Sequence, residues 1–142
     1  AGAAPAPGES RWLVREALLS GMGLCYLCGF LVSAVQHRAL WGSLGLAPLP
    51  GPGERPVPIF ALLERLGWGY GYWQLELVSW LGAALALQLL VGRARTALVP
   101  AACWVLYLSI VNLEAPFTYS YGWEWLTCEV GFLVIFLCPV AS

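Results

Sequence analysis

The residues most able to do chemistry in this sequence are a few carboxylates set among apolar residues. Glu129 lies inside an apolar run, where a carboxylate must be paired, protonated or turned toward a polar cavity. With Asn112, Glu114 and Glu124 it could form a polar cluster near one face of a membrane. Two close carboxylates could do acid/base work, but no nucleophile or cofactor motif accompanies them. We therefore expect a structural hydrogen-bond network, no catalytic residue and no enzymatic activity.

The other groups that could hold a cofactor or react are one histidine and a cysteine pair. His37 is the only histidine, so an all-histidine metal site is impossible, and no metal site is expected. His37 and Glu129 remain the candidates for holding a cofactor such as a pigment or haem. Cys25 and Cys28 form a C-x-x-C motif, which has redox meaning at an exposed helix start. Because this motif lies inside an apolar run, we expect the two thiols to serve packing.

The composition around these residues is that of a membrane protein. Of 142 residues, 60% are hydrophobic and 11% are charged, against roughly 25% charged in an ordinary soluble domain. The net charge of −1 gives no reason to expect a nucleic-acid partner. We expect an integral membrane protein that contacts lipids and other membrane proteins.

The hydrophobic pattern predicts an all-α bundle of about four transmembrane helices with a long Pro/Gly-rich first loop. Residues 1–10 read as a flexible lead-in, and residues 11–142 as a single transmembrane helical domain. Residues 39–72 hold several prolines, which cannot continue a helix, although an amphipathic stretch at 59–66 could form a short interfacial one. The first span is long enough, at about 1.5 Å per residue, to cross a hydrocarbon core of roughly 30 Å, whereas the last span is somewhat short. The predicted spans are 17–35, 73–91, 96–113 and 125–140.

The arginines predict how these spans are oriented. Arg11 and Arg15 precede the first span, and Arg93 and Arg95 lie between the second and third. An even number of spans places all four on one side, and arginines near spans favour the cytosolic side. Both termini should therefore face the cytosol, or the stroma or matrix of an organelle.

The first span carries a stripe of small residues that could bind another helix. Small side chains at a spacing of four line one helix face and allow a second backbone to come close. The partner could be another protein or, equally, this chain's own helices. The stripe consists of Gly21, Cys25, Gly29 and Ser33.

A run of aromatic residues before the last span is a second candidate for partner binding. An aromatic stands at every second position, so an extended segment would place the rings alternately on two faces. The run could bind a partner or lipid, or it could be an ordinary interfacial aromatic belt. Its members are Phe117, Tyr119, Tyr121, Trp123 and Trp125.

Three motifs in the last third of the chain resemble a known family. Residues 106–112 read Leu-Tyr-Leu-Ser-Ile-Val-Asn, residues 119–124 read Tyr-Ser-Tyr-Gly-Trp-Glu, and residues 129–139 read Glu-Val-Gly-Phe-Leu-Val-Ile-Phe-Leu-Cys-Pro. Their wording and order are similar to the N-terminal transmembrane region of the lipase maturation factor family. The first span and the following Trp-Gly-Ser-Leu-Gly-Leu-Ala-Pro resemble the family's first span and its Gly-Leu-Leu-Pro loop. Ala47 departs from that loop.

The resemblance implies a polytopic protein of the endoplasmic reticulum that assists the folding and assembly of lipases, its clients, without known catalysis. Family members continue beyond the Cys-Pro motif with further spans and a client-handling domain, so we expect a trimmed piece or a short relative. The alternative is a structural transmembrane subunit of an organellar bioenergetic complex, a photosystem or respiratory complex. Such a subunit would lie in a thylakoid or inner mitochondrial membrane and contact chlorophyll, carotenoid or lipid.

Overall fold

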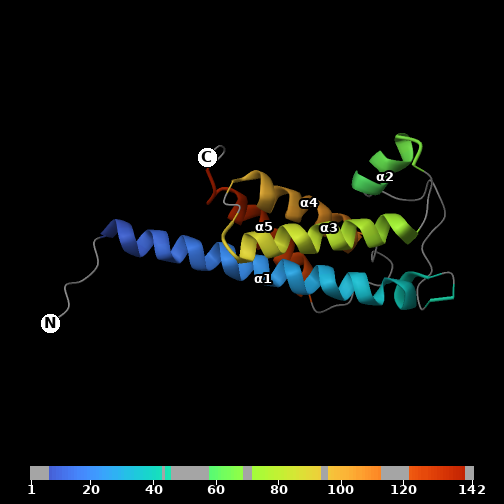
Figure 1. Cartoon of the computed structure of the whole chain (residues 1–142), viewed down its shortest axis with the longest axis horizontal. Helices are drawn as coiled ribbons and strands as arrows, with labels where there is room; N and C mark the ends of the chain where they lie inside the picture. Colours follow the sequence, from blue (N-terminus) through green and yellow to red (C-terminus); the bar gives the residue numbers. More distant parts are fainter. Residues whose placement is uncertain are drawn as a thin grey trace.

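The computed structural model consists of helices wherever it describes the chain, namely residues 7–42, 44–45, 58–68, 72–93, 96–112 and 122–139. No strand occurs in these ranges, which confirms the prediction of an all-α protein. Figure 1 shows the order of the helices along the chain. They are α1 (Pro7–Trp41), α2 (Pro58–Arg65), α3 (Tyr72–Leu90), α4 (Leu98–Val111) and α5 (Trp123–Ile135).

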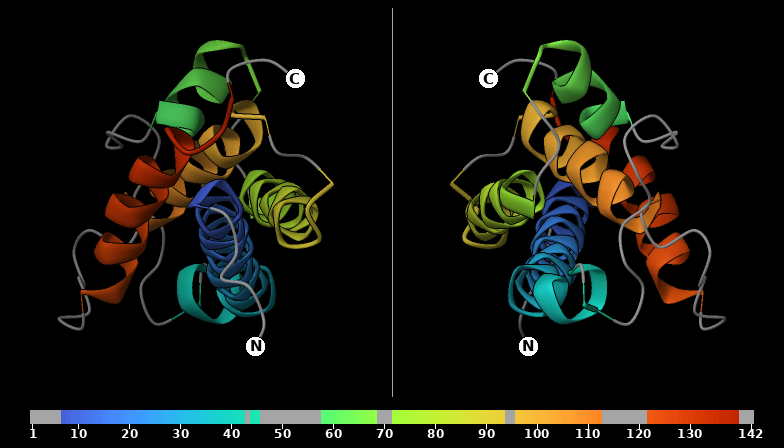
Figure 2. Two further views of the ribbon diagram at one scale, coloured as in Figure 1. Left: turned by 90° about the vertical axis from the view of Figure 1, so that its left-hand side faces the viewer. Right: turned by 90° about the vertical axis from the view of Figure 1, so that its right-hand side faces the viewer.

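Helix α1 is the central element of the packing. It makes its most extensive contacts with α3 and also contacts α4 and α5. Both end-on views in Figure 2 show α1 with α3 on one side and α5 on the other, while α4 completes the group. The short helix α2 packs against α4. Each of the other three long helices therefore depends on α1 for part of its buried surface.

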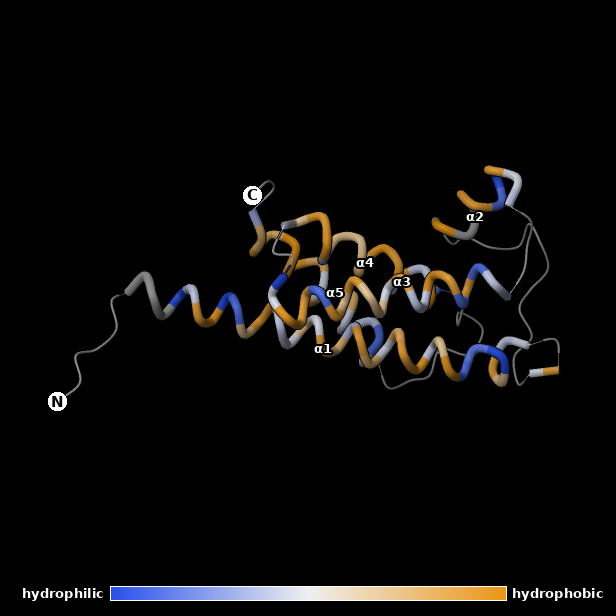
Figure 3. Tube along the Cα trace, viewed as in Figure 1, coloured by the Kyte–Doolittle hydropathy of each residue, from blue (hydrophilic) through white to orange (hydrophobic). Residues whose placement is uncertain are grey.

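Two of the helices are long and apolar enough to cross a membrane by themselves. These segments are Arg11–Trp41 and Tyr72–Leu90, and Leu98–Val111 is a shorter apolar helix. Figure 3 shows hydrophobic residues along α3, α4 and the middle of α1, with hydrophilic residues toward both ends of α1. At about 1.5 Å per residue, α4 and α5 are each roughly 20 Å long, less than the hydrocarbon core. The expected four spans therefore remain a prediction.

Helix α1 begins before and ends after the span expected for it. It starts at Pro7, inside the stretch expected to be a lead-in, because proline suits the first turn of a helix. It then continues past His37 and Arg38, since polar side chains end a hydrophobic run without breaking a helix. The Arg38 guanidinium lies 3.5 Å from the Glu76 carboxylate of α3.

The last helix is shorter than the sequence pattern predicts, and Pro139 explains the difference. A proline ring clashes with the carbonyl four residues earlier, here that of Ile135, where α5 ends. The chain then tightens, because the Phe136 and Cys138 amides donate to carbonyls three residues back, at 3.2 Å. Of the expected Pro/Gly-rich loop, residues 43, 46–57 and 69–71 lie outside the described residues, and its amphipathic stretch forms α2.

The core centres on three buried aromatic rings from two helices. Tyr26 and Phe30 belong to α1, and Tyr107 belongs to α4. The ring centroids of Tyr26 and Tyr107 are 5.4 Å apart, and those of Phe30 and Tyr107 are 5.6 Å apart. Both pairs have edge-to-face geometry, which places the positive ring edge against the negative ring face. The three rings therefore hold α1 and α4 in a defined register.

Each of these rings packs against a glycine of a neighbouring helix. We call such a contact between a ring and a glycine a ring seat. A Cβ added to Gly82 of α3 would overlap the Phe30 ring, and one added to Gly29 of α1 would lie 2.5 Å from Tyr107 Cε2. A large ring thus fills the space that the missing side chain leaves. Because neither glycine can be enlarged without moving a ring, both helix pairs approach closely at these points.

The third ring seat connects α1 with α5. A Cβ on Gly131 would overlap the hydroxyl of Tyr26. Gly23 lies on α1 about one turn before Tyr26 and allows that helix to contact the backbone of α3. A Cβ added to Gly23 would lie 2.6 Å from the amide nitrogen of Leu90. We call the set Tyr26, Phe30, Tyr107, Gly29, Gly82 and Gly131 the aromatic–glycine core.

Two sets of backbone hydrogen bonds close the helix ends that precede and follow α4 and α5 at one end of the bundle. Gly92 has φ 73° and ends α3 in a left-handed turn, in which the Arg93 amide donates to the carbonyl of Gln88 at 3.1 Å. Just before α4, the Ala97 amide donates to the carbonyl of Pro139 at 3.0 Å. The start of α4 and the segment after α5 are therefore joined through the backbone.

The ring seats predict that the same glycine-to-alanine change lowers the free energy of unfolding at some positions of the chain and not at others. Gly131→Ala should lower the free energy of unfolding by about 1–3 kcal/mol, the usual cost of overpacking a filled core. Gly21→Ala is the matched control, because its added Cβ would meet nothing within 4 Å. Stability is measured by unfolding in mixed micelles with increasing denaturing detergent.

A second variant identifies the cause of the expected loss. Tyr26→Phe removes the hydroxyl nearest to the added methyl group, so it should recover part of the stability lost in Gly131→Ala. By itself Tyr26→Phe should not destabilise the protein, because the buried hydroxyl has no hydrogen-bond partner in the part of the chain that the structure describes. Equal stability of Gly131→Ala and Gly21→Ala would contradict the seating of Tyr26 on α5.

Candidate functional site

The small-residue stripe of α1 divides into two halves, and the second half packs inside the chain. Gly29 is buried beneath Tyr107. Ser33 is buried as well, and its hydroxyl lies 2.9 Å from the hydroxyl of Ser79 on α3. In a bilayer such a hydroxyl pair satisfies polar groups that lipid cannot satisfy. These two positions join helices of this chain to each other.

The first half of the stripe faces outward. Gly21 and Cys25 are exposed, so they stay available to a partner or to lipid. Cys28 is exposed too, and neither Cys25 nor Cys28 forms a disulfide. The expectation that the stripe binds a partner therefore continues as a proposal for Gly21 and Cys25 alone.

The glycines that matter most for packing are not the ones the sequence pattern selected. Gly23, Gly82 and Gly131 make the close approaches described above, yet none belongs to the predicted stripe. A signal existed in the large aromatics Tyr26 and Phe30 inside an otherwise aliphatic span, because a buried ring needs a gap in the facing helix. Which glycine supplies the gap depends on which helices are neighbours.

The predicted polar cluster is not joined by contacts in the part of the chain that the structure describes. The Asn112 side chain donates to the Leu108 carbonyl at 2.8 Å, closing the end of α4. Glu124 is half-buried in the first turn of α5, and Glu129 is exposed farther along that helix. Glu114 lies outside the described residues. No hydrogen bond or ion pair joins the described members to one another.

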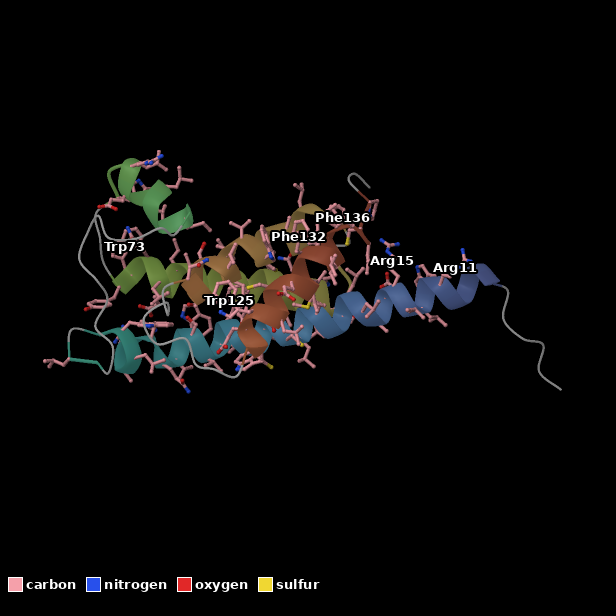
Figure 4. The ribbon with its side chains drawn as sticks, turned by 180° about the vertical axis from the view of Figure 1, so that it is seen from behind. Arg11, Arg15, Trp73, Trp125, Phe132 and Phe136 are labelled. Atoms are coloured by element: carbon pink, nitrogen blue, oxygen red, sulfur yellow. The ribbon has the colours of Figure 1, made fainter. Side chains whose placement is uncertain are left out.

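Glu129 lies on the side of α5 that faces away from the bundle. The buried side of α5 carries Gly131 and Val134, and Glu129 is almost half a turn from Gly131 at about 3.6 residues per turn. Figure 4 shows Trp125, Phe132 and Phe136 following one another along the same helix. A carboxyl group therefore accompanies exposed aromatic rings on an outward helix face.

His37 is almost completely buried, with 2% of its surface exposed. Its Nδ1 donates to the Ala34 carbonyl at 2.8 Å, and its buried Nε2 has no hydrogen-bond partner among the described residues. Among the described residues no group of three or more His, Cys, Asp or Glu side chains could hold a metal. His37 thus offers a single nitrogen, and its role in cofactor binding stays a prediction.

The predicted aromatic run is described only at its end. Trp123 and Trp125 lie in the first turn of α5, and both are exposed. Phe117, Tyr119 and Tyr121 fall outside the described residues. The Trp104 indole, which the run does not include, donates to the Cys128 carbonyl at 2.9 Å and thereby connects α4 with α5.

These features define the class of the protein: an all-helical integral membrane protein whose apolar helices pack through glycines and aromatic rings. A family model described as the lipase maturation factor transmembrane domain matches residues 13–142. The chain belongs to the lipase maturation factor family. The resemblance seen in the motifs between residues 106 and 139 is thereby confirmed.

Several curated relatives support this membership. Lipase maturation factor 1 of Bos taurus is 33% identical over 91% of this chain and 25% of its own length. Lipase maturation factor 2 of Xenopus laevis is 36% identical over 94% of this chain and 20% of its own length. The chain therefore spans a quarter or less of these relatives. No solved structure matches. The alternative of a photosystem or respiratory subunit finds no support in these matches.

The serine pair gives a testable measure of polar contact inside the bundle. A double-mutant cycle of Ser33→Ala and Ser79→Ala should give a coupling energy of about 0.6 kcal/mol, the average for hydrogen bonds between membrane helices. Unfolding in mixed micelles supplies the four free energies. Ser109 is the control, because its hydroxyl donates within its own helix to Val105, so its cycle with Ser33 should give no coupling. Equal coupling in both cycles would contradict a specific bond.

Proposed function

We propose that this chain is the membrane module of a lipase maturation factor, and that it assists the folding or assembly of client lipases through protein contacts. The observation that carries the proposal is the family match over residues 13–142. The relatives are named as maturation factors, and no enzymatic role is proposed for this chain. The module supplies a rigid intramembrane support, whose outer faces contact other membrane proteins and lipid.

We further propose that α1, α3, α4 and α5 all cross the membrane of the endoplasmic reticulum. α1 and α3 satisfy the length required, and α4 and α5 pack along them. Arg11, Arg15 and Arg93 lie toward the same end of the bundle, which favours the cytosolic side for that end. Figure 4 shows Arg11 and Arg15 on the part of α1 that extends beyond the other helices. The opposite end, with α2, then faces the lumen.

A chimera tests the functional proposal. Residues 13–142 replace the corresponding region of bovine lipase maturation factor 1, and the chimera is expressed in cells that lack their own factor. We expect it to restore the specific activity of a secreted lipase, measured as activity per amount of lipase protein in the medium. A chimera with Gly131→Leu should fail, because the larger side chain displaces Tyr26.

Two controls make this result interpretable. The chimera with Val35→Leu should work as well as the parent, since Val35 is an exposed residue of α1 and belongs to neither the aromatic–glycine core nor the small-residue stripe. An unrelated four-helix membrane bundle placed in the same position should not restore lipase activity. If the unrelated bundle works equally well, the module has no specific role, and the proposal fails.

Glycosylation mapping tests the topology separately. Acceptor sites for N-linked glycans are inserted one at a time, after Gly53 and after Gly92. The site between α1 and α3 should be glycosylated, because the proposed topology places it in the lumen, and the site between α3 and α4 should not. A shift in gel mobility, reversed by a glycosidase, reports each outcome. Glycosylation of the second site would reverse the proposed orientation.

A further inference from the structure

The outward side of α5 carries four residues that form one continuous ridge. Trp125, Glu129, Phe132 and Phe136 follow at spacings of four, three and four, which places them on one face of a helix. Their side chains are exposed, with 42% of Trp125, 44% of Phe132 and 71% of Phe136 uncovered. We call these four residues the outer face of α5. Figure 2 shows α5 at the edge of the bundle. On one border of this face the Phe132 ring packs against Trp104 of α4, with ring centroids 5.4 Å apart, and the rest of the face points outward.

This inference rests on the proposed topology, in which α5 crosses the membrane. In that topology Glu129 is the residue of this face that lipid cannot satisfy. It stands midway along α5, two residues from the Gly131 that receives Tyr26 of the central helix. In the described part of the chain, no hydrogen bond or ion pair reaches its carboxyl group. Ionisable side chains at such depth almost always face protein or a water-filled cavity, because hydrocarbon offers them no partner. The placement of Glu129 therefore indicates that this face is covered by protein.

We propose that the outer face of α5 binds a transmembrane helix from outside these 142 residues that presents a hydrogen-bond donor at the depth of Glu129. The donor is an arginine, lysine, histidine, amide or hydroxyl, since the carboxyl group accepts hydrogen bonds. Spacings of four and three repeat every seven residues, the pattern of two helices that wrap around each other with a left-handed twist. The aromatic rings on either side of Glu129 supply the packing surface for the same helix.

Two other occupants fit this face less well. A second copy related by a two-fold axis would bring Glu129 against Glu129, where two carboxylates repel each other unless one is protonated and donates to the other. Lipid chains would cover the aromatic rings but leave the carboxyl group without a partner. Charge complementarity therefore selects a helix that carries a donor.

The proposal is tested with designed host helices in phosphatidylcholine vesicles. The protein carries a fluorescent donor, and the host helix, about 20 leucine-rich residues long, carries an acceptor. One host has a single central arginine, and its matched partner has leucine at that position. Energy transfer at increasing host concentration gives the affinity of the pair. We expect the arginine host to bind about five- to tenfold more tightly, as a single intramembrane bond of about 1 kcal/mol or slightly more implies.

Variants of the protein locate the binding site. Glu129→Leu should remove the preference for the arginine host, and Glu129→Gln should keep part of it, because the amide oxygen still accepts. Phe136→Ala should lower the affinity for both hosts by the same factor, since it removes only packing contacts. Cys28→Leu is the control, an equally exposed change on α1, and it should alter neither affinity. Circular dichroism and micelle unfolding verify that each variant keeps the native bundle.

Three outcomes would overturn the proposal. Equal affinity for the two hosts would show that Glu129 does not select a donor. Absence of binding by either host would show that the face does not accept a helix. Energy transfer between two labelled copies of the protein that disappears in Glu129→Leu would assign the face to self-association.

Discussion

The seating of three aromatic rings on three glycines is the interaction on which the rest of the structure depends. Within a bilayer, apolar side chains gain little by leaving lipid for another apolar surface, so helices associate through close packing and hydrogen bonds. Tyr26, Phe30 and Tyr107 fill gaps on α5, α3 and α1, and each gap exists because a side chain is missing. The two rings of α1 thereby fix the neighbours on either side of that helix, which explains its central position.

Hydrogen bonds between helices add directional contacts to this packing. The Ser33–Ser79 pair and the bond from the Trp104 indole to the α5 backbone each connect two helices. Within the described residues, Tyr26 and His37 carry buried atoms that have no hydrogen-bond partner, although the body of each side chain is tightly packed. Glu129 differs from both because it is exposed. A buried atom without a partner is a local cost of packing, whereas an exposed carboxyl group needs a polar neighbour if its helix crosses the membrane.

The sequence predicted the class of the protein and its family but not the contacts that hold it together. The lack of charge over residues 17–35 was enough to predict α1, because hydropathy measures exclusion from water directly. The ends of α1 were missed, since polar residues such as His37 do not break helices. Of the predicted stripe, Gly29 and Ser33 pack inside the chain, whereas Gly21 and Cys25 face outward. The seats at Gly82 and Gly131 could not be found, because they depend on which helices become neighbours and in what register.

The two sides of the bundle differ in a way that separates lipid contact from protein contact. The outward face of α3 carries apolar residues such as Leu77, Trp80 and Leu81, each about half exposed, and lipid chains satisfy these completely. The outward face of α5 carries aromatic rings as well, but Glu129 stands among them. α5 is also the shortest of the four helices around the aromatic–glycine core, so its ends reach less far toward the two membrane surfaces. A short helix with a carboxyl group midway along its length is poorly suited to contact lipid alone, whereas α3 is well suited to it.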